Sequence, residues 1–211
     1  MKLFCWALMA IFTTSISWAE ITKDATEQLA DLLSPINSFS ANFHQQLLDS
    51  KGISYQKLTG ILHGHKPNQV HWTVFQPAAQ MIVSNGARLW LYDPDLEQVI
   101  IEPYANNPEA NPVSLLLGGP HQISESFSLI EQKLVNESTR QFVLEPIKLN
   151  ALYTQLIIEF THGSLSGISF SDNLGQKTII EFQNFILNPS FKDNFFTFKI
   201  PEGVDVVSYV H

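Results

Sequence analysis

Apolar and polar residues alternate along most of this chain, in short segments that turn residues separate roughly every ten positions. A period of two is typical of strands that bury one face. Many short antiparallel strands of this kind form a sheet that curls toward a barrel or half-barrel. The predicted strands are Phe39–Leu48, Ser54–His63, Gln69–Phe75, Gln80–Ser84, Arg88–Tyr92, Gln98–Pro103, Gln141–Pro146, Thr154–Thr161, Gly167–Ser171, Thr178–Ile186 and Phe196–Ile200.

Helical patterns are few beside so many strands. Apolar residues recur at spacings of three and four between Asp24 and Ile36, which predicts one amphipathic helix. Val113 to Leu117 form a short apolar helix or turn that Gly118-Gly119 ends, and the pattern of Ser126–Leu134 fits a helix and a strand equally. We expect a mainly β (α+β) fold, in which a strongly curved antiparallel sheet forms an unclosed barrel. The two small helices cover its apolar concave face.

One hairpin can be registered from the sequence. Asn85-Gly86 separates two apolar segments, a strong hairpin signal because both central residues of a type I′ turn adopt positive φ. A two-residue turn at this point pairs Ser84 with Ala87 and Ile82 with Leu89. The opposite face of the hairpin, with Met81, Val83, Trp90 and Tyr92, also carries Arg88 near its edge.

The concave side of this part of the sheet follows from the alternation. Because side chains alternate between faces, Ile82 lies on the same side as Leu89 and Leu91. The preceding strand alternates a wholly apolar set with His71, Thr73 and Phe75, and we expect the apolar set to face the interior. The predicted interior residues are Val70, Trp72, Val74, Ile82, Leu89 and Leu91. From the residues alone, an ordinary packed core explains such a set as well as a binding site does.

The first nineteen residues are typical of a secretory signal. Lys2 precedes an apolar run from Leu3 to Ile16, and Ser17-Trp18-Ala19 fits a cleavage site, so we expect residues 20–211 to form a single domain. Cys5, the only cysteine, lies inside this signal, which leaves the mature chain without a thiol, a disulfide or a lipid anchor. Such a chain suits the bacterial periplasm. The net charge of −8 and the lack of a basic patch argue against a nucleic-acid partner.

Catalytic and metal-binding patterns are weak. His63 and His65 would share one strand face, but no carboxylate or cysteine is spaced to complete a zinc site. The alternating carboxylates of Asp93–Glu97 lack the glycine and the distal glutamate of a calcium loop. Nucleophile elbows and phosphate-binding glycine motifs are absent. The sequence therefore predicts neither an enzyme nor a cofactor.

The strongest motifs resemble those of a known family. Lys66-Pro67-Asn68 with Val70 and Trp72, then Ser84-Asn85-Gly86, then Leu89-Trp90-Leu91-Tyr92-Asp93-Pro94-Asp95-Leu96-Glu97-Gln98 resemble the LolA family of periplasmic outer-membrane lipoprotein carriers. The resemblance continues more loosely through Asn111-Pro112 and Pro201-Glu202-Gly203-Val204. It implies that the interior of an unclosed barrel binds acyl chains, through the six interior residues given above.

The resemblance also implies a movable lid over that interior. Its residues would be Leu29, Leu32, Leu33, Val113, Leu115 and Leu116. In the family an arginine at the place of Lys66 hydrogen-bonds the lid backbone and helps to hold it shut. A lysine donates to carbonyls without the planar fork of arginine. Lys66 is therefore either a weaker latch or a solvated surface lysine.

Partners and alternatives follow from the same resemblance. It implies a monomer that receives outer-membrane lipoproteins from the inner-membrane exporter LolCDE and delivers them to the outer-membrane receptor LolB. The missing cysteine at the cleavage point favours the carrier over the receptor, which has its own lipid anchor. The alternatives are a periplasmic lipid or lipoprotein sensor with the same half-barrel, and a lipid hydrolase, against which the missing nucleophile motifs argue.

Overall fold

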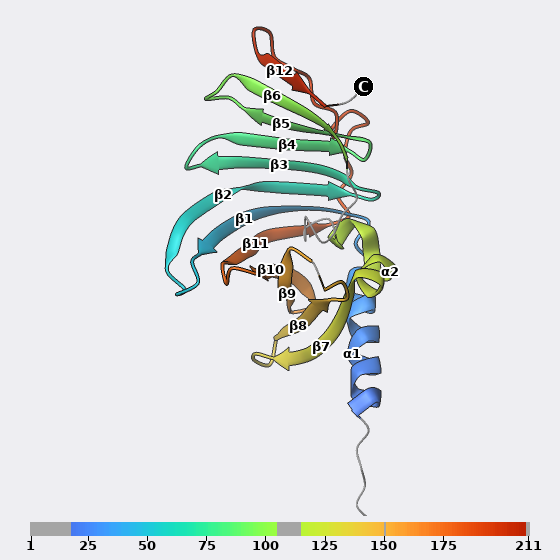
Figure 1. Ribbon diagram of the computed structural model, residues 1–211. Helices are drawn as coiled ribbons and strands as arrows, with labels where there is room; N and C mark the ends of the chain where they lie inside the picture. Colours follow the sequence, from blue (N-terminus) through green and yellow to red (C-terminus); the bar gives the residue numbers. More distant parts are fainter. Residues whose placement is uncertain (1–17, 105–114, 150, 210–211) are drawn as a thin grey trace, which may run out of the picture.

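The computed structural model describes residues 18–104, 115–149 and 151–209 of the 211-residue chain. Twelve strands form one curved sheet in the order β12-β6-β5-β4-β3-β2-β1-β11-β10-β9-β8-β7 (Figure 1). Neighbouring strands are antiparallel, except that β12 runs parallel to β6. Because β12 and β7 end this order without pairing to each other, the barrel is unclosed, as predicted. The elements are α1 Trp18–Leu33, β1 Ser38–Leu48, β2 Ser54–His65, β3 Gln69–Gln76, β4 Gln80–Asn85, β5 Arg88–Asp93, β6 Gln98–Pro103, α2 Leu115–Ser126, β7 Phe127–Leu134, β8 Thr139–Pro146, β9 Tyr153–Thr161, β10 Ser164–Asp172, β11 Lys177–Leu187 and β12 Asp205–Ser208.

Helix α1 buries the apolar stripe that predicted it. Ala25, Leu29 and Leu33 recur at every fourth position and are at most 4% exposed. The helix ends at Leu33 rather than at the predicted Ile36, since Pro35 cannot continue the hydrogen-bond ladder. It begins at Trp18, so cleavage after Ala19 would remove its first two residues.

Asn188 joins the end of α1 to the sheet. Its Oδ1 accepts hydrogen bonds from the backbone N–H groups of Asn37 (2.8 Å) and Ser38 (3.0 Å). Its Nδ2 donates to the carbonyl of Pro35 at 2.8 Å. A single side chain thus satisfies backbone groups on both sides of the turn between α1 and β1, which fixes the path of the chain from the helix into the sheet.

Helix α2 is longer than the sequence predicted. Gly118-Gly119 were expected to end it, but the helix kinks at Gly119 (φ 76°, ψ −177°) and resumes to Ser126. Pro120 follows the kink directly, where a first-turn proline loses no hydrogen bond. The undecided segment 126–134 is strand β7, with only Ser126 belonging to the helix.

The register of the β4–β5 hairpin differs by two residues from the predicted one. Ser84 pairs with Leu89 and Ile82 with Leu91, instead of with Ala87 and Leu89. The Asn85 Oδ1 accepts hydrogen bonds from the N–H groups of Ala87 and Arg88, and this side-chain turn replaces the expected two-residue turn. Because a shift of two keeps every side chain on its face, the predicted faces are unchanged.

The main core lies between the concave face of the sheet and the two helices. It combines residues of β1–β3 and β8–β11 with α1 and α2, and Phe39, Leu62, Leu116 and Phe142 in it are completely buried. This arrangement explains why a chain with alternating strands still needs two apolar helices. They cover one end of a face that the curved sheet cannot bury by itself.

The convex face carries a second core that the sequence did not reveal. Val83, Trp90 and Val99 are buried there against Phe198 and Val204 of the C-terminal segment. The predicted strand Phe196–Ile200 is wrong, because this segment crosses the convex face without strand pairing. The last strand is β12 instead, which covers the otherwise open edge of β6 (Figure 1).

Candidate functional site

The predicted interior residues lie on one face of three neighbouring strands. Trp72 in β3 pairs with Ile82 in β4, which in turn pairs with Leu91 in β5. Val70 pairs with Ser84, and Ser84 with Leu89. Val74 lies two residues after Trp72 and therefore shares its face. The structure thus brings all six together on the concave side, whereas their binding of acyl chains stays a prediction.

Burial of this face falls off away from the helices. Val70 and Val74 are 7% and 5% exposed and belong to the main core. Trp72, Ile82, Leu89 and Leu91 are only partly buried, as is Ile100, which pairs with Leu91 from β6. The concave face of β4–β6 therefore presents apolar side chains that the described residues leave incompletely covered.

Trp72 marks the boundary between the packed and the open parts of the face. Its ring meets that of Phe43 edge-on, with centroids 5.0 Å apart. Its Nε1 is buried and has no hydrogen-bond partner among the described residues. A buried indole N–H without an acceptor is costly, so an acceptor oxygen at this position would lower the free energy.

Most of the predicted lid residues whose side chains the structure describes are buried in the main core. Leu29, Leu33 and Leu116 are 4%, 1% and 0% exposed in the main core, and Leu32 packs against it while partly exposed. Val113 lies outside the described residues, and so does the side chain of Leu115. Neighbouring Leu117, 2% exposed, lies over the inner face of Gly64 in β2, where any side chain would collide with Phe39 and this leucine.

Lys66 reaches helix α2. It lies half-buried in the turn between β2 and β3, and a Cβ built on Gly119 would lie 3.7 Å from its Nζ. Burial lowers the pKa of the Lys66 ammonium. The Lys66 ammonium therefore lies beside the kink of α2 and not out in solvent. A latch on α2 would need this position.

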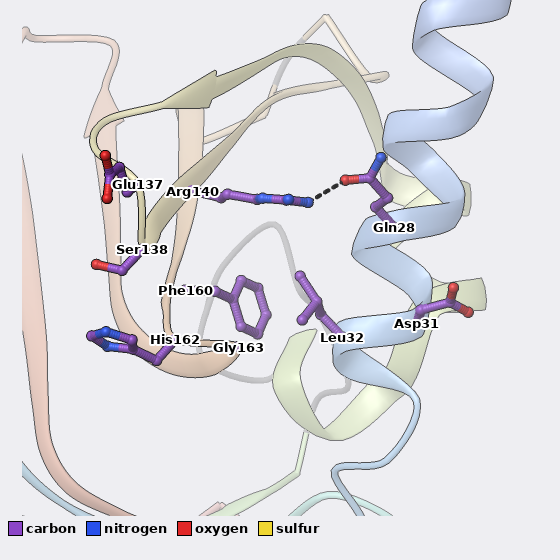
Figure 2. A pocket seen from close by; sticks show the side chains of 9 residues that line it. All are labelled: Gln28, Asp31, Leu32, Glu137, Ser138, Arg140, Phe160, His162 and Gly163. Atoms are coloured by element: carbon purple, nitrogen blue, oxygen red, sulfur yellow. Dashed lines mark hydrogen bonds between the residues drawn. The ribbon is translucent and has the colours of Figure 1, made fainter.

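Cavities lie on both sides of helix α1. An apolar seam of about 60 Å³ separates α1 from α2 and is lined by residues such as Leu29, Ile123 and Leu144. On the other side lies a pocket of about 480 Å³, whose floor contains Leu32 and Phe160 (Figure 2). Arg140 Nη1 donates to Gln28 Oε1 across this pocket at 2.6 Å. The larger pocket could not be predicted from the sequence, because its lining comes from α1 and two hairpin turns that are distant in the chain.

His63, one of the two histidines considered for a metal, packs instead against His71 and the C-terminal segment. The rings of His63 and His71 lie 6.1 Å apart on the convex face and contact Phe195 of the C-terminal segment, each at 5.0 Å. Burial lowers the pKa of both imidazoles; the nearby His71 lowers that of His63 further, and a backbone hydrogen bond to Phe195 partly offsets the effect at His71. Within the described ranges, no three His, Cys, Asp or Glu side chains are grouped to hold a metal ion.

The sequence matches the family model described as "Outer membrane lipoprotein carrier protein LolA" over residues 34–199. The chain belongs to the LolA family. The LolA relative from Chromohalobacter salexigens, an outer-membrane lipoprotein carrier protein, is 35% identical over 98% of both chains. The family is one of carriers and not of enzymes.

Solved structures show the same fold at low sequence identity. A LolA superfamily protein from Nitrosomonas europaea matches with a TM-score of 0.50 and 13% identity, over 83% of this chain and 97% of that one. An uncharacterized conserved protein from Thermus thermophilus matches with a TM-score of 0.54 and 11% identity, over 88% and 98%. In the part of the LolA-family chain that the structure describes, no helix is long and apolar enough to cross a membrane.

Proposed function

We propose that this chain carries lipoproteins through the periplasm by sheltering their acyl chains on its concave face. The observation that carries this proposal is an apolar face, half-covered by two small helices, in a member of a lipoprotein-carrier family. Burial of each CH₂ group contributes about 0.8 kcal/mol, so exposing three acyl chains of about sixteen carbons to water would cost on the order of 35 kcal/mol. A lipoprotein cannot cross water at a useful rate without such cover.

The acyl chains would lie along Val70, Trp72, Val74, Ile82, Leu89 and Leu91. The unpartnered Nε1 of Trp72 would donate a hydrogen bond to an ester or amide carbonyl at the head of the cargo. This arrangement fits a ligand whose chains are apolar and whose only polar groups are close to one end.

Helices α1 and α2 would act as the lid. The seam between them measures about 60 Å³, whereas ligand pockets usually measure about 300–1,000 Å³. Cargo would therefore displace the helices, and part of the binding free energy would be used to open them. Lys66, held against the kink of α2, would bias the empty protein toward the closed form.

The partners come from the family alone. We propose that the monomeric carrier accepts lipoproteins from the exporter LolCDE and releases them to the receptor LolB, without a cofactor of its own. If the open form of the empty protein is sparsely populated, the apparent affinity for cargo is lowered by that fraction, which favours release of the lipoprotein.

Release of newly made lipoproteins from spheroplasts tests the proposal. Purified protein added to the medium should bring acylated lipoprotein into the supernatant, and the Trp72→Glu variant should not. Cells depleted of the protein should retain outer-membrane lipoproteins in the inner membrane. Normal sorting in depleted cells would refute the carrier function.

A further inference from the structure

Three hairpin turns lie side by side at one rim of the sheet. They connect β1 to β2, β8 to β9, and β10 to β11. Asn173 Nδ2 of the β10–β11 turn donates to the carbonyl of Ala151 in the β8–β9 turn at 2.9 Å. Tyr55 at the start of β2 donates through its hydroxyl to Gln176 Oε1 at 3.3 Å. These contacts join turns that are distant in the sequence into one surface.

Each of these turns raises large apolar side chains into solvent. The exposed fractions of this rim patch are 61% for Ile53, 56% for Tyr55, 102% for Leu149, 59% for Leu152 and 76% for Leu174. Single exposed leucines are ordinary, but five large apolar side chains on or beside three adjoining turns are not explained by folding.

Two carboxylates hold the tips in place. Asp49 Oδ1 accepts hydrogen bonds from the N–H groups of Lys51 and Ile53, and Asp172 Oδ1 accepts them from those of Leu174 and Gln176. Such side-chain turns fix the backbone of a tight loop. Ile53 and Leu174 therefore project from two turns whose backbone is fixed by hydrogen bonds.

The charge of the rim departs from that of the whole chain. Segments 49–57, 145–149 and 172–177 contain four lysines and three carboxylates, whereas the full chain has a net charge of −8. An anionic surface would therefore be repelled less at this rim than the net charge of the whole chain suggests. Lysines beside apolar tips can extend toward phosphate groups while their stems stay on apolar surface.

We propose that the rim patch seats the protein transiently on an anionic phospholipid bilayer. The five apolar side chains enter the interfacial layer, and Lys51, Lys148 and Lys177 lie at the level of the headgroups. A lipid surface is the occupant that fits, because the tips project separately from three turns. A protein partner would need a matching pocket for each tip, whereas lipids rearrange around any shape.

Cosedimentation with vesicles of phosphatidylethanolamine and phosphatidylglycerol tests this proposal. The full mature chain should bind them, and Ile53→Glu/Leu149→Glu/Leu174→Glu should lower the partition coefficient roughly tenfold or more. The matched control, Ile130→Glu/Leu134→Glu/Val135→Glu, adds the same three charges away from this rim, at side chains of β7 and its following turn that are 50%, 67% and 53% exposed. Lack of binding by the unmodified chain, or an equal loss in the control, would overturn the proposal.

A second measurement locates the contact. Cys5, the only cysteine, lies in the predicted signal, so Leu174→Cys and Leu134→Cys each give a single labelling site in the mature chain. A polarity-sensitive dye should shift to the blue with vesicles at position 174 and not at 134; equal shifts would contradict a rim contact. The vesicles contain no lipoprotein, and the rim variant should still bind a fluorescent fatty acid. Failure of the rim proposal is therefore distinguishable from failure of the carrier proposal.

Discussion

Two adjacent glycines in α2 should respond differently to the same substitution. Gly119 has φ 76° and ψ −177°, a backbone conformation that is nearly restricted to glycine. A Cβ at this position meets only Lys66 Nζ at an ordinary 3.7 Å, so the cost of Gly119→Ala is conformational and amounts to about 1–3 kcal/mol. Gly118 lacks a positive φ. A Cβ at this position would overlap the end of the flexible Gln122 side chain, which can rotate away, and would lie 2.9 Å from the Gln122 Cβ, so the backbone must also shift by a few tenths of an ångström. Gly118→Ala should change the free energy of unfolding by no more than about 1 kcal/mol.

Urea unfolding of both variants measures this difference. With a slope of roughly 2–3 kcal/mol/M, Gly119→Ala should lower the midpoint by about 0.3–1.5 M, while Gly118→Ala should change it much less. If the substitution relieves its strain by displacing α2, the closed form is weakened. The folded variant should then bind a fluorescent fatty acid more tightly than the unmodified protein does. Equal midpoints for the two variants would refute the idea that the kink depends on a glycine conformation.

Three further predictions concern the concave face, the convex face and the junction of α1. Trp72→Glu should stay folded, because the Trp72 side chain is partly exposed. It should weaken fatty-acid binding by on the order of tenfold or more, since a carboxylate in an acyl-chain site must be desolvated when the ligand binds. Unchanged binding in a fluorescence titration would show that Trp72 is not part of the site. Burial lowers the pKa of His63 and His71, so the unfolded chain binds more protons and the free energy of unfolding should fall as the pH drops below about 6.5. Urea titrations between pH 5 and 8 should show a flatter dependence for His63→Phe/His71→Phe, and an identical slope would contradict this assignment. Asn188→Ala should lower the free energy of unfolding by about 1–3 kcal/mol. Asn188→Asp keeps the acceptor for two backbone N–H groups and should lower it less, which thermal melting of both variants measures. Equal losses of stability would argue against the capping role.

The sequence by itself determined most of the strands and the faces of their side chains. Side chains of a strand alternate strictly, so Val70 and Trp72 had to share a face whatever the final topology. Even the error in the β4–β5 register left the faces intact, because the turn at Asn85 shifted the pairing by an even number of residues. The stripe through Leu29 and Leu33 fixed the buried side of α1 in the same way, since its spacing is a property of the helix.

Only the tertiary structure decided how the two faces of the sheet are covered. Trp90 and Leu91 are equally apolar neighbours, yet Trp90 is buried under the C-terminal segment and Leu91 stays partly open on the concave side. That difference depends on a segment about a hundred residues further along, which binds the sheet through aromatic side chains rather than through a strand pattern. The position of Lys66 beside the kink at Gly119 is likewise a meeting of distant segments. Local periodicity records which side of an element is apolar, whereas the segment that covers that side is chosen by packing across the whole chain.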